Sequence, residues 1–481
     1  MVRTFFEEIS AIRRREMSSI SSTGSKLPVK TGICYGLGNL AFASLSTVIG
    51  YFMLFYLTDY AGIAPAAVGT MILIARIWDA VNDPIMGTIL DNTKPHPKWG
   101  QARPYVLLGS IPMALFFVMI FSVPQSLSIS MKLAWSYVAY IGFGMAFTVA
   151  SISFLSMPMR ITMNPDKRIT LAMWVSFLAF PTALISALVP AMVKAFSGPS
   201  ENAYRAYMFV SIVFAIVAIC CIIFTFFGVK EKYTEDKQRE KISIAKGLGV
   251  FVKCKPWLKL ISITLLMFLF FSVNMSSLVY YLKYYIKQPG LMAIGGLLAM
   301  STIVVALLTV KPLVKKFGKR RVVLIAVGIS AAALVARVFL KDHNVVLFLI
   351  TLFLTFISYG AYSIVKMPLL FDSIEYAEYK TGINAKSIGV TGDTFIAKLA
   401  QGFGPAIVGY VLQWGGYMAQ APEQSEKLLG ALFVLNVYLP LGCLVLITIL
   451  MFTYNIEDEM PKVREELRQK MLTAQAQPFS E

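Results

Sequence analysis

The sequence has few charged side chains and almost no histidine. Charged residues make up 15% of the 481 residues, against about a quarter in a soluble domain, while hydrophobic residues make up 57%. Only two histidines are present, and the five cysteines show no metal-ligand or disulfide spacing. We find no nucleotide-binding loop, metal cluster or catalytic nucleophile arrangement. These absences argue against an enzyme, a cofactor and an ATP-driven pump, and they favour an integral membrane protein.

Long apolar runs recur along the chain. A run of about 20 apolar residues is long enough to cross a bilayer as a helix. Six runs precede a polar stretch and six follow it, at 33–57, 68–90, 105–123, 133–157, 171–196 and 207–229, and at 258–281, 291–310, 322–340, 345–371, 388–414 and 429–454. The sequence therefore predicts an all-α membrane protein with 12 transmembrane helices in two six-helix halves.

The distribution of basic residues predicts the orientation of the chain. The 44 lysines and arginines lie between the apolar runs rather than along one polar face, so we attribute the net charge of +18 to topology and not to nucleic-acid binding. Their positions place both termini in the cytoplasm, with the chain in the inner (plasma) membrane. The expected organisation is a basic leader (1–30), an N-terminal half (31–229), a linker (230–257), a C-terminal half (258–454) and a tail (455–481).

The second apolar run contains three charged residues in the stretch "RIWDAVNDPIMG". Asp79 and Asp83 are four residues apart and Arg76 precedes Asp79 by three, so the three side chains share one helix face. A charged group at the bilayer centre costs at least about 2.5 kcal/mol, so such groups face the bundle interior and pair. Lys398 in the eleventh run is the expected partner from the other half. We interpret the carboxylates as a site for H⁺ or Na⁺, the alternative being a structural ion pair between the halves.

Four segments of the chain carry a family resemblance. They read "YFMLFYLTDYAGI", "VGTMILIARIWDAVNDPIMGTILD", "KWGQARPYVLLGSIP" and "DSIEYAEYKTGINAKSIG". These segments resemble the glycoside–pentoside–hexuronide:cation symporter family, and the resemblance extends from about Lys30 to Tyr454. It implies the major-facilitator fold and cation-coupled symport of a sugar or glycoside, by rocking of the two halves about a midplane site.

The resemblance also implies roles for residues around the cation site. Asp79 and Asp83 match carboxylates that bind the coupling cation, with Lys398 nearby as the counter-charge. Thr148 matches a threonine whose oxygen lies beside the cation. Ser151 stands where a well-known member has a carboxylate, so the site has one negative charge fewer. A proton needs only one titratable oxygen, and this favours H⁺ slightly over Na⁺. Arg76 matches an arginine near the cavity.

The sugar-binding side chains of that member are not retained, because its first-span aspartate aligns with Ala43 and its fifth-span arginine with the region of Val175. Sugar recognition needs polar groups for the hydroxyls and an aromatic face for the ring. The remaining candidates, each of which can also be a packing residue, are Asn39, Ser44, Ser151, Ser153, Trp174, Asn274, Tyr362 and Lys366. Lys366 favours an anionic sugar if it faces the cavity and is otherwise a snorkelling lysine. The expected gating residues are Arg103, Asp372 and Glu375.

Two other functions fit the sequence. One is a sodium-dependent lysolipid carrier, which requires an opening toward lipid and an apolar half-cavity. The other is a non-transporting sugar sensor on a carrier fold, in which Asp79, Asp83 and Lys398 form a structural triad. For symport, the expected partners are a small sugar and the lipid bilayer, and the expected functional unit is a monomer.

Overall fold

The computed structural model describes residues 27–93, 95–96, 98–162, 165–197, 203–231, 249–340, 342, 344–383, 386–421, 423–463 and 465–466. Most of the predicted leader (1–30) and linker (230–257) lies outside the described residues, as does the tail beyond 466. In the described part the chain is helical apart from connecting segments and one isolated bridge between His96 and Gly100.

The first half is built from six membrane-length segments. The first segment is interrupted by two short π-helical turns, and the fifth is divided near its end. Their bounds are α2 (Val29–Val48) with η1 (Ile49–Met53) and η2 (Tyr56–Tyr60), α3 (Pro65–Asn92), α4 (Arg103–Ile120), α5 (Ile129–Ile161), α6 (Pro165–Ala187) with α7 (Val189–Ser197), and α8 (Ala203–Gly228).

The second half repeats this plan. Its first segment ends in a π-helical turn, and its last contains another. The bounds are α10 (Lys255–Tyr280) with η3 (Tyr281–Tyr285), η4 (Pro289–Leu291) leading into α11 (Met292–Phe317), α12 (Lys319–Leu340), α13 (Val345–Thr381), α14 (Lys386–Trp414), and α15 (Glu426–Phe433) continued by η5 (Val434–Tyr438) and α16 (Leu439–Phe452). The predicted all-α membrane fold is confirmed, and the described helices are consistent with two six-helix halves.

Ten of the described helical segments are long and apolar enough to cross a bilayer. The other two long helices are α3, which carries charges in its middle, and α6. Two helices run furthest past the carboxyl ends of the apolar segments that predicted them: α11 extends to Phe317 rather than 310, and α13 to Thr381 rather than 371. Each ends at a glycine with positive φ, Gly318 at 84° and Gly382 at 69°. The helix end is therefore set by a C-cap residue and not by the edge of the apolar run.

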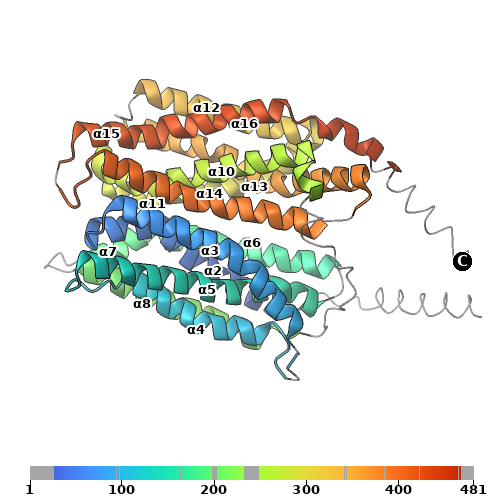
Figure 1. The fold of residues 1–481 in the computed structure, drawn as a ribbon, viewed down its shortest axis with the longest axis horizontal. Coiled ribbons are helices and arrows are strands. Elements are labelled where there is room, and N and C mark those ends of the chain that lie inside the picture. The colour runs from blue at the N-terminus through green and yellow to red at the C-terminus, as the bar shows by residue number, and fades with distance from the viewer. Residues whose placement is uncertain are drawn as a thin grey trace, which may run out of the picture.

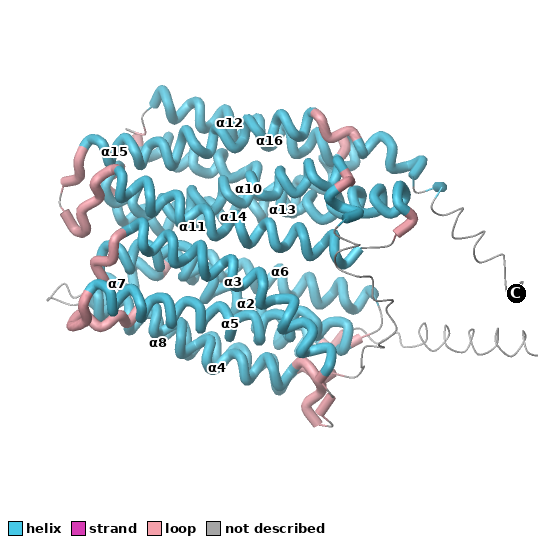
Figure 2. Tube along the Cα trace, in the orientation of Figure 1, coloured by secondary structure: helices cyan, strands magenta, loops and turns pink. Residues whose placement is uncertain are grey.

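The two halves form separate layers. Figure 1 shows the first half from blue to green on one side and the second half from yellow-green to red on the other. Across the seam between them, α3 packs against α14, α6 packs against α11, and η1 contacts α10. Connecting segments gather at the two ends of the bundle (Figure 2). We call the end with the start of α2 the terminal end, and the opposite one, with Asp59 and Tyr417, the distal end.

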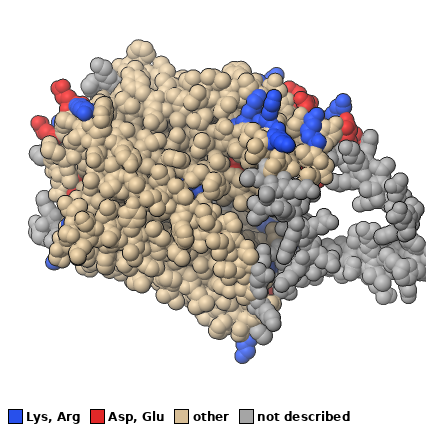
Figure 3. Space-filling view, in the orientation of Figure 1, with Lys and Arg blue, Asp and Glu red and all other residues tan. Residues whose placement is uncertain are grey.

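The charged side chains follow the same division. In Figure 3 the middle of the visible face is almost free of charge, and lysine, arginine and acidic side chains gather toward the two ends. Large apolar side chains such as Leu308, Phe339 and Leu155 are exposed by two thirds or more of their surface. Because a water-soluble protein rarely exposes so continuous an apolar surface, this belt fits a lipid environment.

Candidate functional site

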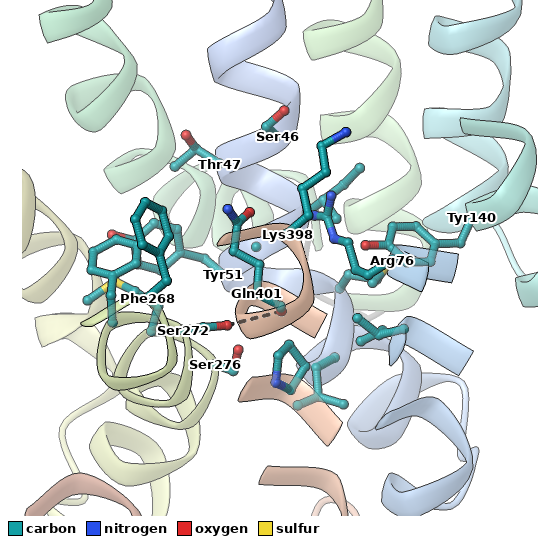
Figure 4. Close-up of a pocket in the computed structure, with 18 of the residues that line it drawn as sticks. Ser46, Thr47, Tyr51, Arg76, Tyr140, Phe268, Ser272, Ser276, Lys398 and Gln401 are labelled. Atoms are coloured by element: carbon teal, nitrogen blue, oxygen red, sulfur yellow. Dashed lines mark hydrogen bonds between the residues drawn. The ribbon is translucent and has the colours of Figure 1, made fainter. Parts of the chain in front are cut away.

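A cavity of about 350 Å³ lies between the two halves. Its size falls in the range typical of small-molecule sites. The first half contributes Tyr51 from η1, Arg76 from α3 and Tyr140 from α5, and the second half contributes Phe271 from α10 together with Lys398 and Gln401 from α14. Figure 4 shows labelled side chains from both halves around this space. Movement of one half against the other would therefore reshape the cavity.

Asp83 on α3 is held from two other helices. The ammonium of Lys398 on α14 donates to Oδ2, and Thr148 Oγ1 on α5 donates to Oδ1 at 3.0 Å. Both members of the ion pair keep about a quarter of their side-chain surface accessible, 24% for Asp83 and 25% for Lys398. The structure thus brings together Asp83, Lys398 and Thr148, which the sequence singled out. The Asp83–Lys398 ion pair joins the two halves and stays accessible.

Asp79 occupies a tighter environment one turn away. Its Oδ2 lies 3.5 Å from Arg76 Nη1, and the guanidinium lies 5.9 Å from the centre of the Tyr140 ring. Its Oδ1 is buried without a hydrogen-bond partner and sits against Gly144 of α5, where a Cβ atom would collide with it. A buried carboxylate oxygen without a donor is costly as an anion, so the position suits a proton or another small cation.

The four charged groups balance one another. Arg76 and Lys398 supply two positive charges, and Asp79 and Asp83 supply two negative charges. A bound cation would give the group one net positive charge. The described part of the chain contains no cluster of three or more histidine, cysteine or acidic residues that could hold a metal ion.

Of the site residues predicted from the sequence, Arg76 and Lys398 line this cavity, and the sugar candidates do not. Ser151, the further cation candidate, and Asn39 are half-buried on α5 and α2, and Trp174 on α6 lies against Gly32 of α2. Ser44, Ser153 and Asn274 donate to main-chain carbonyls of their own helices.

The remaining two sugar candidates belong to a buried cluster in the second half. Tyr362 shares a hydrogen bond of 2.7 Å with Thr264, which donates to Asp393 at 2.9 Å. Lys366 lies 2.7 Å from Asp393 and over the Phe268 ring rather than in the cavity. The charge of Lys366 is therefore paired, which removes the observation that favoured an anionic sugar.

The predicted gating residues Arg103 and Asp372 contact their own halves. The Arg103 guanidinium donates to the carbonyl of Phe226, and its main-chain N–H donates to Glu231. Asp372 is paired with Lys319, and Glu375 is half-buried on α13.

A polar cluster at the distal end, which sequence reasoning missed, joins the two halves. Asp59 of η2 accepts from Lys283 Nζ at 2.6 Å, Tyr284 OH at 2.6 Å, Tyr417 OH at 2.5 Å and the Gln420 N–H at 3.1 Å. All four donors belong to the second half, and the Asp59 side chain is fully buried. We call these five residues the distal latch. Two features of the sequence could have pointed to it: the tyrosine-rich run "YYLKYY", and an aspartate just past the end of the first apolar run.

Comparisons with known proteins agree with this geometry. The family model described as MFS/sugar transport protein matches residues 34–458. The chain is 31% identical to the isoprimeverose transporter of Lactiplantibacillus pentosus, covering 90% of this chain and 89% of that protein. It is 26% identical to the glucuronide carrier protein homolog of Escherichia coli (strain K12), covering 90% and 94%. The solved D-xylose-proton symporter has the same fold, with a TM-score of 0.64, 14% identity and coverage of 90% and 99%.

These comparisons cover nearly all of the described helices and both six-helix halves. The relatives are multi-span carriers, among them an inner membrane symporter of Escherichia coli (strain K12). The predictions of a non-enzymatic membrane carrier and of a resemblance to sugar:cation symporters are confirmed. The chain belongs to the MFS/sugar transport protein family.

Proposed function

We propose that this symporter couples uptake of a sugar to a proton bound at Asp79 and Asp83. The observation that carries the proposal is the accessible ion pair between Asp83 and Lys398, which joins the two halves and of which Lys398 borders the cavity. A proton on Asp83 would remove its charge and weaken its hold on Lys398. Loading of the cation site is thereby linked to the contact that the halves must break when they rock.

The distal latch indicates which side of the membrane the cavity faces in the present conformation. The lysine and arginine distribution favours a cytoplasmic terminal end, which puts the latch on the outer side of the membrane. With the latch closed, the cavity belongs to an inward-facing state. In the outward-facing state Asp59 would separate from its partners in the second half and admit sugar and cation from outside.

The identity of the ion follows from the available oxygens. Na⁺ prefers several oxygen ligands, and Asp79 Oδ1, Asp83 and Thr148 offer few of them. A proton requires one carboxylate oxygen. A membrane potential of 100 mV contributes about 2.3 kcal/mol per charge and a tenfold proton gradient about 1.4 kcal/mol. Together they would sustain roughly several-hundredfold accumulation at one proton per sugar.

With Asp83 ionised and paired, the cavity presents no unpaired positive side chain, and we infer that it favours a neutral sugar or glycoside. Its two positive side chains are both paired with carboxylates, and Lys366 is paired with Asp393. Of the relatives, one is named for isoprimeverose and another for glucuronides. Hydroxyl-bearing solutes would find serine, threonine, tyrosine and glutamine side chains along both walls. We propose that one chain suffices for transport, because the cavity is formed within a single bundle.

External pH would test the proposal directly. Energy-depleted cells producing this protein are held in a lightly buffered suspension, and glycosides, pentosides and hexuronides are added one at a time, with and without Na⁺. Alkalinisation by one sugar is expected, and Asp83→Asn should abolish it. Asp458→Asn, which changes an exposed acid at the terminal end, is the matched control and should behave as the wild type. Undiminished alkalinisation in Asp83→Asn would contradict the proposal.

A further inference from the structure

An aromatic wall lines the second-half side of the cavity. Phe271 of α10 and Tyr359 of α13 are stacked, with ring centres 3.9 Å apart and planes 12° apart, and Phe268 meets Tyr359 edge-on at 5.8 Å. All three residues border the cavity and are half-buried. A flat, preformed aromatic surface is suited to the apolar face of a sugar ring, because it needs little ordering when the ring binds.

Tyr51 reaches this wall from the first half. It lies in the middle of η1, a π-helical turn, and such turns are frequent at functional sites. Its hydroxyl is buried and has no hydrogen-bond partner, although the residue borders the cavity and is only 8% exposed. Figure 4 labels Tyr51 and Phe268 among the side chains that border the cavity. An unpaired buried hydroxyl costs stability, so its retention calls for a partner that arrives in another state.

Polar groups of the second half border the same cavity and complete such a site. The side-chain amide of Gln401 borders the cavity, and the structure gives it no partner, while its main-chain carbonyl accepts from Ser272 at 3.1 Å. Ser276 borders the same space one turn further along α10. An amide both donates and accepts, which suits adjacent sugar hydroxyls. Figure 4 shows the hydrogen bond between Ser272 and Gln401, with Ser276 close to Ser272.

We propose that the cavity binds a pyranose ring against the Phe271–Tyr359 stack, with the Tyr51 hydroxyl and the Gln401 amide bonding to the ring hydroxyls. This inference rests on the proposed function and specifies its substrate as a cyclic sugar with an apolar face. The bound ring would contact Tyr51 of the first half and the aromatic wall of the second half together. Sugar binding would thus draw the two halves together at the cavity.

Tyr51→Phe separates this role from packing, because it removes one oxygen and keeps the ring. If the hydroxyl waits for the sugar, the unliganded variant should melt higher than the wild type, by about 1–3 °C, since a buried unpaired group is removed. The same variant should bind the sugar about tenfold more weakly, since one hydrogen bond is lost. A packing residue whose hydroxyl is already satisfied would change in the opposite sense, with a lower melting temperature and unaltered affinity.

The experiment measures melting temperature and ligand affinity of the purified full chain in detergent. The probes are isoprimeverose, methyl xylopyranoside and methyl glucuronide as cyclic sugars, with xylitol as the open-chain comparison. Tyr285→Phe, which changes a half-buried tyrosine outside the cavity, is the matched control and should alter neither quantity. Tyr359→Leu should weaken pyranoside binding about tenfold, and Tyr359→Phe, which keeps the stack, less than twofold.

The outcomes distinguish this inference from the proposed function. Higher melting temperature with weaker pyranoside binding in Tyr51→Phe supports the inference. Unchanged affinity in both Tyr51→Phe and Tyr359→Leu overturns it. The inference is also overturned if xylitol binds as tightly as the pyranosides, or if none of the pyranosides binds. Alkalinisation by an open-chain solute that is lost in Asp83→Asn would then still support cation-coupled symport without a pyranose site.

Discussion

The distal latch and the proposed cation site use the same chemical pairing in different surroundings. In each, an aspartate of the first half meets a lysine of the second half, Asp59 with Lys283 and Asp83 with Lys398. The Asp59 side chain is fully buried and accepts from four donors, whereas Asp83 keeps 24% of its side-chain surface accessible and accepts from two.

This difference assigns different tasks to similar pairs. A carboxylate surrounded by donors is stabilised as an anion and holds its partners in place. An accessible carboxylate with few donors can exchange its lysine for a proton at modest cost. On this proposal, the burial of the aspartate and the number of its hydrogen-bond donors separate a structural lock from a coupling site. The aspartate–lysine pair itself does not.

The largest effect is expected at the accessible pair. Asp83→Asn removes the titratable oxygen, and Lys398→Gln removes the counter-charge. Each should reduce sugar accumulation from several-hundredfold to about onefold, because the proton no longer drives transport. Exchange of labelled for unlabelled sugar across the membrane should persist, because the cavity remains. Accumulation and exchange are measured in the same membrane vesicles.

The double variant sharpens this assignment. Asp83→Asn with Lys398→Gln leaves no unpaired charge, so it should melt closer to the wild type than either single variant does. It should nevertheless fail to accumulate sugar. Restored accumulation in the double variant would show that the pair only holds the halves together.

Asp59→Asn should open the latch. The substitution leaves Lys283 without its carboxylate and should destabilise the closed distal end by about 3 kcal/mol. The population should shift outward, so an impermeant thiol reagent added outside should label a Ser46→Cys reporter in the cavity at least tenfold faster. Lys287→Gln, an exposed lysine four residues beyond Lys283, is the control. Equal labelling rates in the Asp59→Asn and wild-type backgrounds would exclude a gate at this position.

The fold was largely predictable because lipid imposes a simple rule on sequence. A helix that crosses a bilayer needs about 20 apolar residues, so α8 (Ala203–Gly228) was expected at 207–229 and α12 (Lys319–Leu340) at 322–340. The π-helical turns η1 and η2 were not expected. η1 lies within the apolar run and contacts α10, whereas η2 extends past that run to Asp59, which accepts from Lys283 and Tyr284 of η3. No local pattern encodes these long-range contacts.

The site was predictable only where charge stood in an apolar run. Asp79, Asp83 and Lys398 were identified because an ionised group in lipid needs a partner. Tyr51 and Tyr359 carried no such signal, because aromatic residues make up 13% of the chain and most of them are packing residues. Asp59 lies at a helix end, where a charge is unremarkable, and only the folded chain places it against Lys283.

A smaller effect is expected from Gly144→Ala, which acts on Asp79 through space. A Cβ atom at residue 144 would collide with Asp79 Oδ1 and push the carboxylate toward Arg76. The unpaired oxygen would gain a donor, so proton binding at Asp79 should weaken about three- to tenfold. Half-maximal transport should shift to lower pH by about half a unit to one unit. The control is Gly142→Ala, on the same helix but facing Phe116 instead of Asp79. An equal shift of the pH of half-maximal transport in this variant would point to a general effect on α5.

The smallest effect tests the latch alone. Burial raises the pKa of the Tyr417 phenol above its ordinary range, and the nearby Asp59 raises it further. A raised pKa means that the folded latch holds this proton, so its contribution is complete below pH 10 and is lost only as the pH rises through the higher folded value. Tyr417→Phe should therefore speed external labelling of the Ser46→Cys reporter by about two- to fivefold, equally at pH 6, 7.5 and 9, because one of the donors to Asp59 is gone. A pH-dependent difference between Tyr417→Phe and the wild type within that range would mean that Tyr417 titrates during transport and that the latch, like the accessible pair, responds to protons.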